Sequence, residues 1–81
     1  MKTKIAIIGG TGKEGKGLAY RWAKFGHEVV IGSRAVEKAQ AAADEINILI
    51  DHKDGRVVGL ENIQAADWGE IIVLTVPYIA H

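Results

Sequence analysis

The chain has 81 residues, a formal net charge of zero and no cysteine. It therefore has room for one small core, lacks the overall positive charge that attracts nucleic acid, and carries neither disulfides nor thiolate metal sites. An apolar fraction of 48% and a charged fraction of 25% exclude a disordered chain. The first apolar run, which begins at Ile5, is too short for a signal peptide or a membrane span. We expect a cytoplasmic domain with no nucleic-acid or membrane partner.

The first half of the chain alternates predicted strands and helices. Ile5–Ile8 is a short apolar run without a polar face, which is typical of a strand buried on both sides. Apolar residues then recur at spacings of three and four, which predicts an amphipathic helix of about three turns that ends at Gly26. A second apolar strand at 27–32 and a second helix from Val36 follow. The apolar stripe of the first helix consists of Leu18, Ala19, Trp22 and Phe25.

The second half begins with a less regular stretch, in which residues 46–60 fit either a hairpin or a longer second helix followed by a strand. Since parallel strands need crossover connections, the alternation favours a helix to about residue 49 and a short strand at 56–59. A short helix at 61–66 follows, and residues 70–76 are the clearest buried strand in the chain. We therefore expect a single α/β domain over residues 1–81, a half-domain of the Rossmann type with a parallel sheet of about four strands and β-α-β-α-β-α-β order.

A glycine-rich segment joins the first predicted strand to the first predicted helix. Residues 10–15 have the spacing G-x-G-x-x-G, which in this context indicates a dinucleotide site. The glycines allow a tight turn, close approach of the backbone to a pyrophosphate and close packing of helix on strand, while helical N–H groups face the phosphates. Gly9, Gly12 and Gly15 also fit a variant spacing, so the role of each glycine is open by one position. The predicted contacts are Gly9, Gly10, Thr11, Gly12, Lys13, Glu14 and Gly15.

Two other interpretations of the glycines are weaker. A simple turn is disfavoured because interior glycines weaken a helix start by about 0.5–1 kcal/mol each unless a close approach requires them. A nucleoside-triphosphate P-loop matches at Gly10, Gly15 and Lys16. However, Gly17 stands where a Ser or Thr hydroxyl would hold magnesium. A dinucleotide is therefore the favoured ligand.

The end of the second predicted strand indicates which dinucleotide is bound. An acidic residue here would bind the ribose of NAD, but the chain has Gly32, Ser33 and Arg34. The side chains of Ser33 and Arg34 are donors suited to a 2′-phosphate, with Thr11 and Lys38 as helpers, and each charge-assisted hydrogen bond contributes about 1.5–3 kcal/mol. The alternative is that Ser33 caps the next helix and Arg34 is solvated. The sequence therefore predicts NADP(H) as the cofactor.

Thr75, Val76 and Pro77 lie at the carboxyl end of the last predicted strand, where open parallel sheets bind their ligands. Their backbone is expected to line the path to the nicotinamide. The chain shows no paired-carboxylate or Ser/His/Asp pattern, and its histidines share no metal-ligand spacing. We therefore predict neither a catalytic residue nor a metal. Trp22 is predicted to pack in the core and Trp68 to cover it.

The chain resembles the amino-terminal part of the coenzyme F420-dependent NADP oxidoreductases. The segments that carry the resemblance are residues 9–12, 15–19, 26–29, 31–34, 37–39, 65–67 and 73–77. The resemblance implies hydride transfer between NADPH and the deazaflavin ring of F420. It also implies contacts to the 2′-phosphate from Thr11, Ser33, Arg34 and Lys38. Members of the family continue through further strands and a helical carboxyl-terminal domain that completes the deazaflavin pocket, so we expect this chain alone to bind NADP(H) with little or no turnover.

Two alternatives stay open at this point. One is a stand-alone NADP-sensing module, and the other is the NADP-binding half of a different reductase, such as an imine reductase. The exposed edge of a four-stranded half-sheet would also favour pairing with another chain, which makes a homo-oligomer a further expectation.

Overall fold

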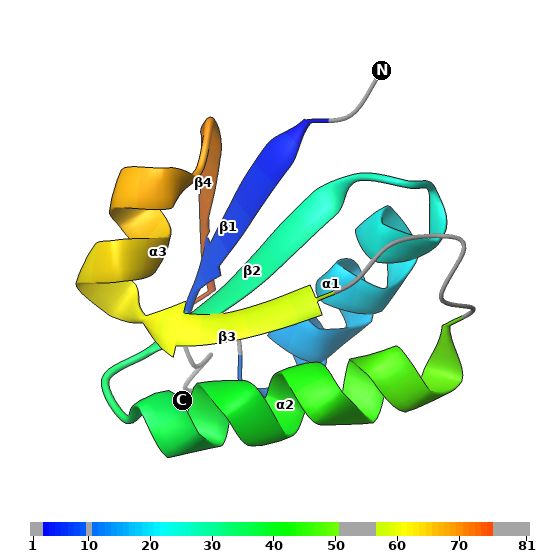
Figure 1. Ribbon diagram of the computed structural model, residues 1–81, viewed down its shortest axis with the longest axis horizontal. Coiled ribbons are helices and arrows are strands. Elements are labelled where there is room, and N and C mark those ends of the chain that lie inside the picture. Colours follow the sequence, from blue (N-terminus) through cyan, green and yellow to red (C-terminus); the bar gives the residue numbers. More distant parts are fainter. Residues whose placement is uncertain (1–2, 10, 51–56, 76–81) are drawn as a thin grey trace, which may run out of the picture.

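The structure, a computed structural model, describes residues 3–9, 11–50 and 57–75, in which strands and helices alternate strictly (Figure 1). The predicted Rossmann-type α/β fold is thereby confirmed. The elements are β1 (Lys4–Ile8), α1 (Lys13–Lys24), β2 (Glu28–Ser33), α2 (Val36–Leu49), β3 (Val57–Glu61), α3 (Asn62–Trp68) and β4 (Ile71–Leu74).

The four strands form one parallel sheet in the order β3-β2-β1-β4. The chain runs outward from β1 through β2 to β3 and then returns to place β4 on the other side of β1. Ile5 pairs with Val29 on one side and with Ile71 on the other. The strand order therefore reverses at β1. In open α/β sheets, ligands bind at such a reversal, outside the carboxyl ends of the strands.

Helices cover both faces of the sheet. Helices α1 and α2 lie on one face and α3 lies on the other (Figure 1). The larger core is formed between the sheet and the α1–α2 layer, and its largest fully buried side chains are Ile7, Val29, Ile31 and Val57. The smaller core, under α3, contains Ala6, Val30 and Ala65. Because β1 and β2 contribute side chains to both cores, their apolar runs without a polar face are explained.

The connection between α2 and β3 agrees with the prediction of a helix followed by a strand. Helix α2 ends at Leu49, and β3 pairs in parallel with β2, which excludes the hairpin. The amide group of Asn47 fastens the two elements together. Its Oδ1 accepts a hydrogen bond from the Val57 N–H and its Nδ2 donates one to the Val57 carbonyl, both at 2.8 Å. Residue 56, where the strand was predicted to begin, lies outside the described residues.

The prediction that residues 70–76 form a buried strand, the clearest one in the sequence, is wrong. Strand β4 covers Ile71–Leu74 and is an edge of the sheet, and Leu74 is 71% exposed. An apolar run predicts that a strand has two apolar faces, but it does not reveal whether a neighbour covers them. Val76, the predicted last residue of this strand, lies outside the described residues.

The first helix agrees with its prediction except at Phe25. Trp22 packs against the larger core, as predicted, and Gly26 has a φ of +93°, a conformation that ends the helix. Phe25 is 78% exposed, because the helix stops at Lys24 and Phe25 already belongs to its cap. Trp68 packs against the smaller core, as predicted.

Candidate functional site

The turn from β1 into α1 forms the centre of the candidate site. Gly9 follows the last residue of β1 with a φ of +75°, and its N–H donates to the carbonyl of Gly32 at 2.9 Å. Helix α1 starts after Gly12, whose carbonyl accepts from the N–H of Lys16 at 2.9 Å. Gly10 lies outside the described residues. The turn therefore begins against the end of β2, at the carboxyl edge of the sheet.

The start of α1 is open to a ligand. No side chain among the described residues caps it, and a Cβ atom on Gly12 would meet nothing within 4 Å. The first N–H groups of a helix have no partners inside the helix and carry a partial positive charge. Lys13 and Glu14 are exposed on this first turn, and Gly15 is buried. This arrangement, directly after β1, suits a phosphate group.

Thr75, the residue that follows β4, lies in close contact with the same turn. The N–H of Thr75 donates to the carbonyl of Ile8 at 3.1 Å, and the Thr75 hydroxyl lies 3.1 Å from that carbonyl oxygen and 2.9 Å from the carbonyl oxygen of Gly9. A Cβ atom on Gly9 would lie 2.8 Å from the main-chain oxygen of Thr75. Both this contact and the positive φ require glycine at position 9. Val76 and Pro77, predicted to continue the site here, lie outside the described residues.

Ser33 occupies the end of β2, beside the glycine turn. It is nearly buried, and its Oγ accepts a hydrogen bond from the N–H of Ala35 at 3.2 Å. Ala35, rather than Ser33, is the N-cap residue of α2. Ser33 therefore does not cap α2 itself, as the alternative interpretation of the sequence held. Its side chain instead accepts a hydrogen bond from the residue that does. Since the hydroxyl acts as the acceptor in this bond, its own proton remains available to a ligand.

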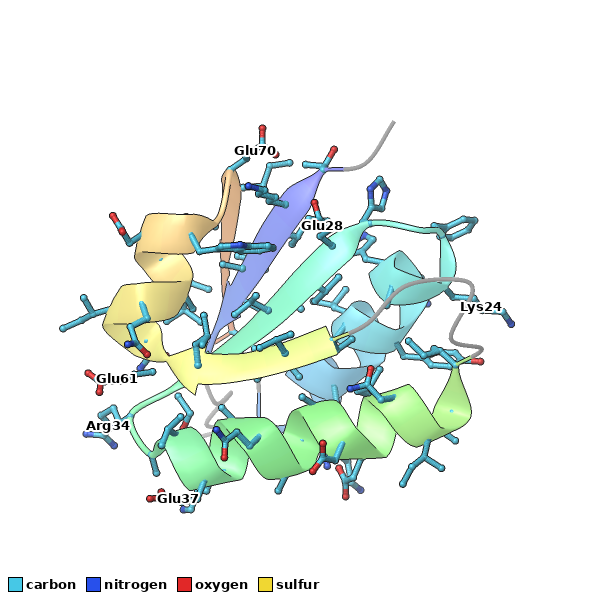
Figure 2. All side chains as sticks on the ribbon, in the orientation of Figure 1. Lys24, Glu28, Arg34, Glu37, Glu61 and Glu70 are labelled. Carbon is cyan, nitrogen blue, oxygen red and sulfur yellow. The ribbon has the colours of Figure 1, made fainter. Side chains whose placement is uncertain are left out.

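Arg34 lies on the turn between β2 and α2, and its side chain is exposed (Figure 2). Among the described residues, no carboxylate forms a salt bridge with Arg34. Two carboxylates share its surroundings. Glu61 pairs with Ser33 across β2 and β3, and Glu37 lies in the first turn of α2. The guanidinium is therefore accessible to an anion beside Ser33.

A hollow of about 250 Å³ between the start of α1 and the exposed side of α2 brings Thr11 and Lys38 together. These two residues were predicted to act on one phosphate, although they are far apart in the sequence. The hollow also contains Lys16 and Glu45, which the sequence reasoning missed. Lys16 Nζ donates to Glu45 Oε2 at 2.7 Å. No pattern in the sequence could have found this pair, because the packing of α1 against α2 creates it.

Among the residues that the structure describes, the other polar side chains form no second candidate site. His27 accepts a hydrogen bond from the N–H of Thr3 at 3.4 Å, at the end of the sheet opposite the glycine turn. Across residues 3–9, 11–50 and 57–75, no group of three or more His, Cys, Asp or Glu side chains could hold a metal ion. In the same ranges, none of the helices has the length and apolar character needed to cross a bilayer.

Comparison with known proteins decides the family. Residues 4–81 match the family described as NADP oxidoreductase coenzyme F420-dependent. The chain belongs to this family. The F420-dependent NADP reductase of Methanothermobacter marburgensis is 49% identical over 74 residues, which cover 91% of this chain and 33% of that protein. The enzyme of the same name from Methanocaldococcus jannaschii is 44% identical over 77 residues, which cover 93% of this chain and 34% of that protein.

Solved structures support the fold assignment. The lactate dehydrogenase of Cryptosporidium parvum matches with a TM-score of 0.74 and 24% sequence identity, over 94% of this chain and 26% of that one. This likeness concerns the fold alone. The chain spans about a third of the length of the F420-dependent NADP reductases that it matches. The resemblance found in the sequence is therefore confirmed for the amino-terminal part of the family.

Proposed function

We propose that this chain is the NADP(H)-binding part of an oxidoreductase that transfers hydride between NADPH and coenzyme F420. The observation that carries the proposal is the uncapped start of α1 at the point where the strand order reverses, with Ser33 and Arg34 beside it. This combination offers one place for a pyrophosphate and a neighbouring place for a 2′-phosphate. Membership of the F420-dependent family supports the choice of both partners.

The pyrophosphate would lie over the turn between β1 and α1. The open space at Gly12 and the N–H groups that follow it fit such a group. Gly9 shapes the turn, and Gly15 is buried on the inner face of α1. The proposed contacts along this segment are Gly9, Gly10, Thr11, Gly12, Lys13, Glu14 and Gly15.

The 2′-phosphate would lie between the carboxyl end of β2 and the start of α2. Ser33 and Arg34 would donate to it from the turn, and Thr11 and Lys38 from the hollow that they share. An Arg guanidinium binds phosphate through paired donors and contributes about 1.5–3 kcal/mol through each charge-assisted hydrogen bond. Since β2 ends in Ser33 rather than a carboxylate, its last residue does not repel this phosphate.

The nicotinamide end would extend past the carboxyl end of β4, along the backbone of Thr75, Val76 and Pro77. When bound, the two cofactors supply the hydride chemistry themselves. The residues of this chain bind the dinucleotide and orient it, and they include no catalytic group in this proposal. Because the chain spans about a third of its relatives, we further propose that residues 1–81 form a single binding domain with little or no turnover alone.

The setting proposed for this function is the cytoplasm, where NADP(H) is available as a soluble coenzyme. The proposed partners are small molecules and a second copy of the chain. Self-association is supported by the exposed apolar edge of β4, since unpaired N–H and C=O groups on an edge strand can pair with another strand.

The test of the proposal is a comparison of NADPH with NADH. Both dinucleotides are titrated into the 81-residue chain, and binding is followed by calorimetry. We expect NADPH to bind about a hundredfold or more tightly than NADH, and Arg34→Ala to remove most of this preference without weakening NADH. Arg21→Ala, which removes an exposed arginine from the last turn of α1, is the matched control and should leave both affinities unchanged. Equal affinities in the unmodified chain, or an unchanged preference in Arg34→Ala, would refute the proposal.

A further inference from the structure

We propose that the hydroxyl of Thr75 is a positioning group for the dinucleotide, which acts by holding the carbonyl groups of Ile8 and Gly9 away from the pyrophosphate. The inference rests on the proposed function and assigns a role to a side chain that was expected to contribute only its backbone. The hydroxyl would not touch the cofactor itself. Its effect would pass through the turn between β1 and α1.

The geometry consists of three contacts between the end of β4 and the turn. The hydroxyl oxygen of Thr75 lies 2.9 Å from the carbonyl oxygen of Gly9 and 3.1 Å from that of Ile8. A hydroxyl has one proton, so the two carbonyl oxygens share it in a three-centre bond. The N–H of Thr75 supplies a second donor to the Ile8 oxygen at 3.1 Å. The last carbonyl of β1 and the first carbonyl of the turn are therefore both directed toward β4.

The peptide groups around Gly9 are held from both sides of β1. The Gly9 N–H donates to the Gly32 carbonyl of β2 at 2.9 Å, while the Gly9 carbonyl faces Thr75 after β4. The main-chain oxygen of Thr75 also occupies the space that a Cβ atom on Gly9 would need. The orientation of this turn therefore depends on contacts with β2 and with the end of β4, which lie on opposite sides of β1 where the strand order reverses.

An anion site requires this orientation. A phosphate is bound by N–H groups that point toward it, and a carbonyl oxygen that turned toward it would bring a partial negative charge against a charged ligand. Without the Thr75 hydroxyl, the Gly9 carbonyl loses its hydrogen bond and gains freedom to turn outward. The loss of affinity would concern the binding of the pyrophosphate, which NADPH and NADH share. It would not concern the 2′-phosphate, which Arg34 would bind on the other side of β1.

The experiment compares Thr75→Val, which keeps the shape and removes the hydroxyl, with Thr75→Ser, which keeps the hydroxyl and removes the methyl group. We expect Thr75→Val to weaken NADPH and NADH by the same factor, about three- to tenfold, the value of one hydrogen bond. Thr75→Ser should stay within about twofold of the unmodified chain, since it retains the donor. If Thr75→Val does not fold, Thr75→Ala takes its place in the same comparison.

A third probe, adenosine 2′-monophosphate, separates positioning from a general loss of structure. It carries the 2′-phosphate and lacks the pyrophosphate, so its affinity should be the same in Thr75→Val and in the unmodified chain. The inference is overturned if Thr75→Val binds both dinucleotides normally, if Thr75→Ser is as weak as Thr75→Val, or if the probe weakens together with them. If the unmodified chain binds neither dinucleotide, the proposed function and this inference both fail, whereas a normal Thr75→Val overturns the inference alone.

Discussion

The backbone of Gly59 on β3 lies directly against the backbone of Ala39 on α2. A Cβ atom on Gly59 would overlap the carbonyl group of Ala39 and the N–H of Gln40. Ala39 is itself fully buried. Helix α2 therefore rests on β3 through two small residues, and this close approach sets the distance between the helix and the sheet.

We expect Gly59→Ala to destabilise the fold. The added methyl group has no space, and overpacking of this kind costs typically about 1–3 kcal/mol, with the higher end expected here because the clash is with backbone. Urea unfolding followed by circular dichroism measures the loss. The matched control is Gly17→Ala on α1, where a Cβ atom would meet nothing within 4 Å. That change should stabilise the helix by about 0.5–1 kcal/mol, and equal effects of the two variants would contradict the packing argument.

Asn47 should be the second sensitive position, because its amide forms two hydrogen bonds with the backbone of Val57. Asn47→Ala leaves the Val57 N–H and carbonyl without their partners, which we expect to cost about 1–3 kcal/mol in the free energy of unfolding. Gln40→Ala is the control, since Gln40 lines the same hollow between α2 and β3 and is exposed. Hydrogen exchange at Val57 gives an independent measurement. Undiminished protection of the Val57 amide in Asn47→Ala would count against the role of this pair.

We expect the chain to self-associate in a concentration-dependent way through the edge strand β4. Its apolar side chains are exposed on an edge of the sheet, and a lysine on an edge strand opposes pairing with another chain. We expect Leu74→Lys to shift the chain toward monomer in analytical ultracentrifugation. Ile63→Lys removes a similarly exposed apolar side chain from α3, which is a helix and offers no strand edge. Association that responds equally to both substitutions would indicate a general loss of surface hydrophobicity rather than pairing at β4.

The order of the elements was predictable because it depends on local patterns. The apolar run at Ile5–Ile8, the spacing of apolar residues along α1 and the turn at Gly26 each identify an element without reference to its neighbours. The exposure of β4 and of Phe25 was not predictable in this way. Both depend on what lies beside a residue in space, and an apolar side chain has the same signature in a sequence whether it is covered or exposed.

The candidate site also contains parts that local patterns indicate and parts that only the packed structure reveals. The glycine turn and the pair Ser33 and Arg34 could be proposed from the sequence because each is a short local motif with a known role at the end of a strand. The hydroxyl contact from Thr75 to Gly9 joins residues 66 positions apart, and the pair of Lys16 with Glu45 joins residues 29 positions apart. Such contacts arise only when the strands and helices are packed together, so no spacing in the sequence predicts them.

Glu45 should lower the affinity of the proposed site for NADPH. Its carboxylate holds Lys16 at 2.7 Å on the wall of the hollow that also contains Thr11 and Lys38. We expect Glu45→Gln to raise the affinity for NADPH by about two- to fivefold, because it removes a negative charge near the phosphate and frees Lys16. The affinity for NADH should not change. Since the ion pair is exposed, the free energy of unfolding should change by less than about 0.5 kcal/mol.

The control for this prediction is Asp44→Asn, which changes the net charge equally. Asp44 is also exposed on α2 but faces the other hollow, between α2 and β3. Calorimetric titrations of NADPH at low and high salt compare the two variants, and the gain in Glu45→Gln should shrink at high salt because screening weakens interactions between exposed charges. If Asp44→Asn raises the affinity as much as Glu45→Gln, the effect belongs to the net charge of the chain and not to the release of Lys16. If Glu45→Gln weakens NADPH binding instead, the ion pair supports the site by holding Lys16 in place, and Glu45 raises the affinity rather than lowering it.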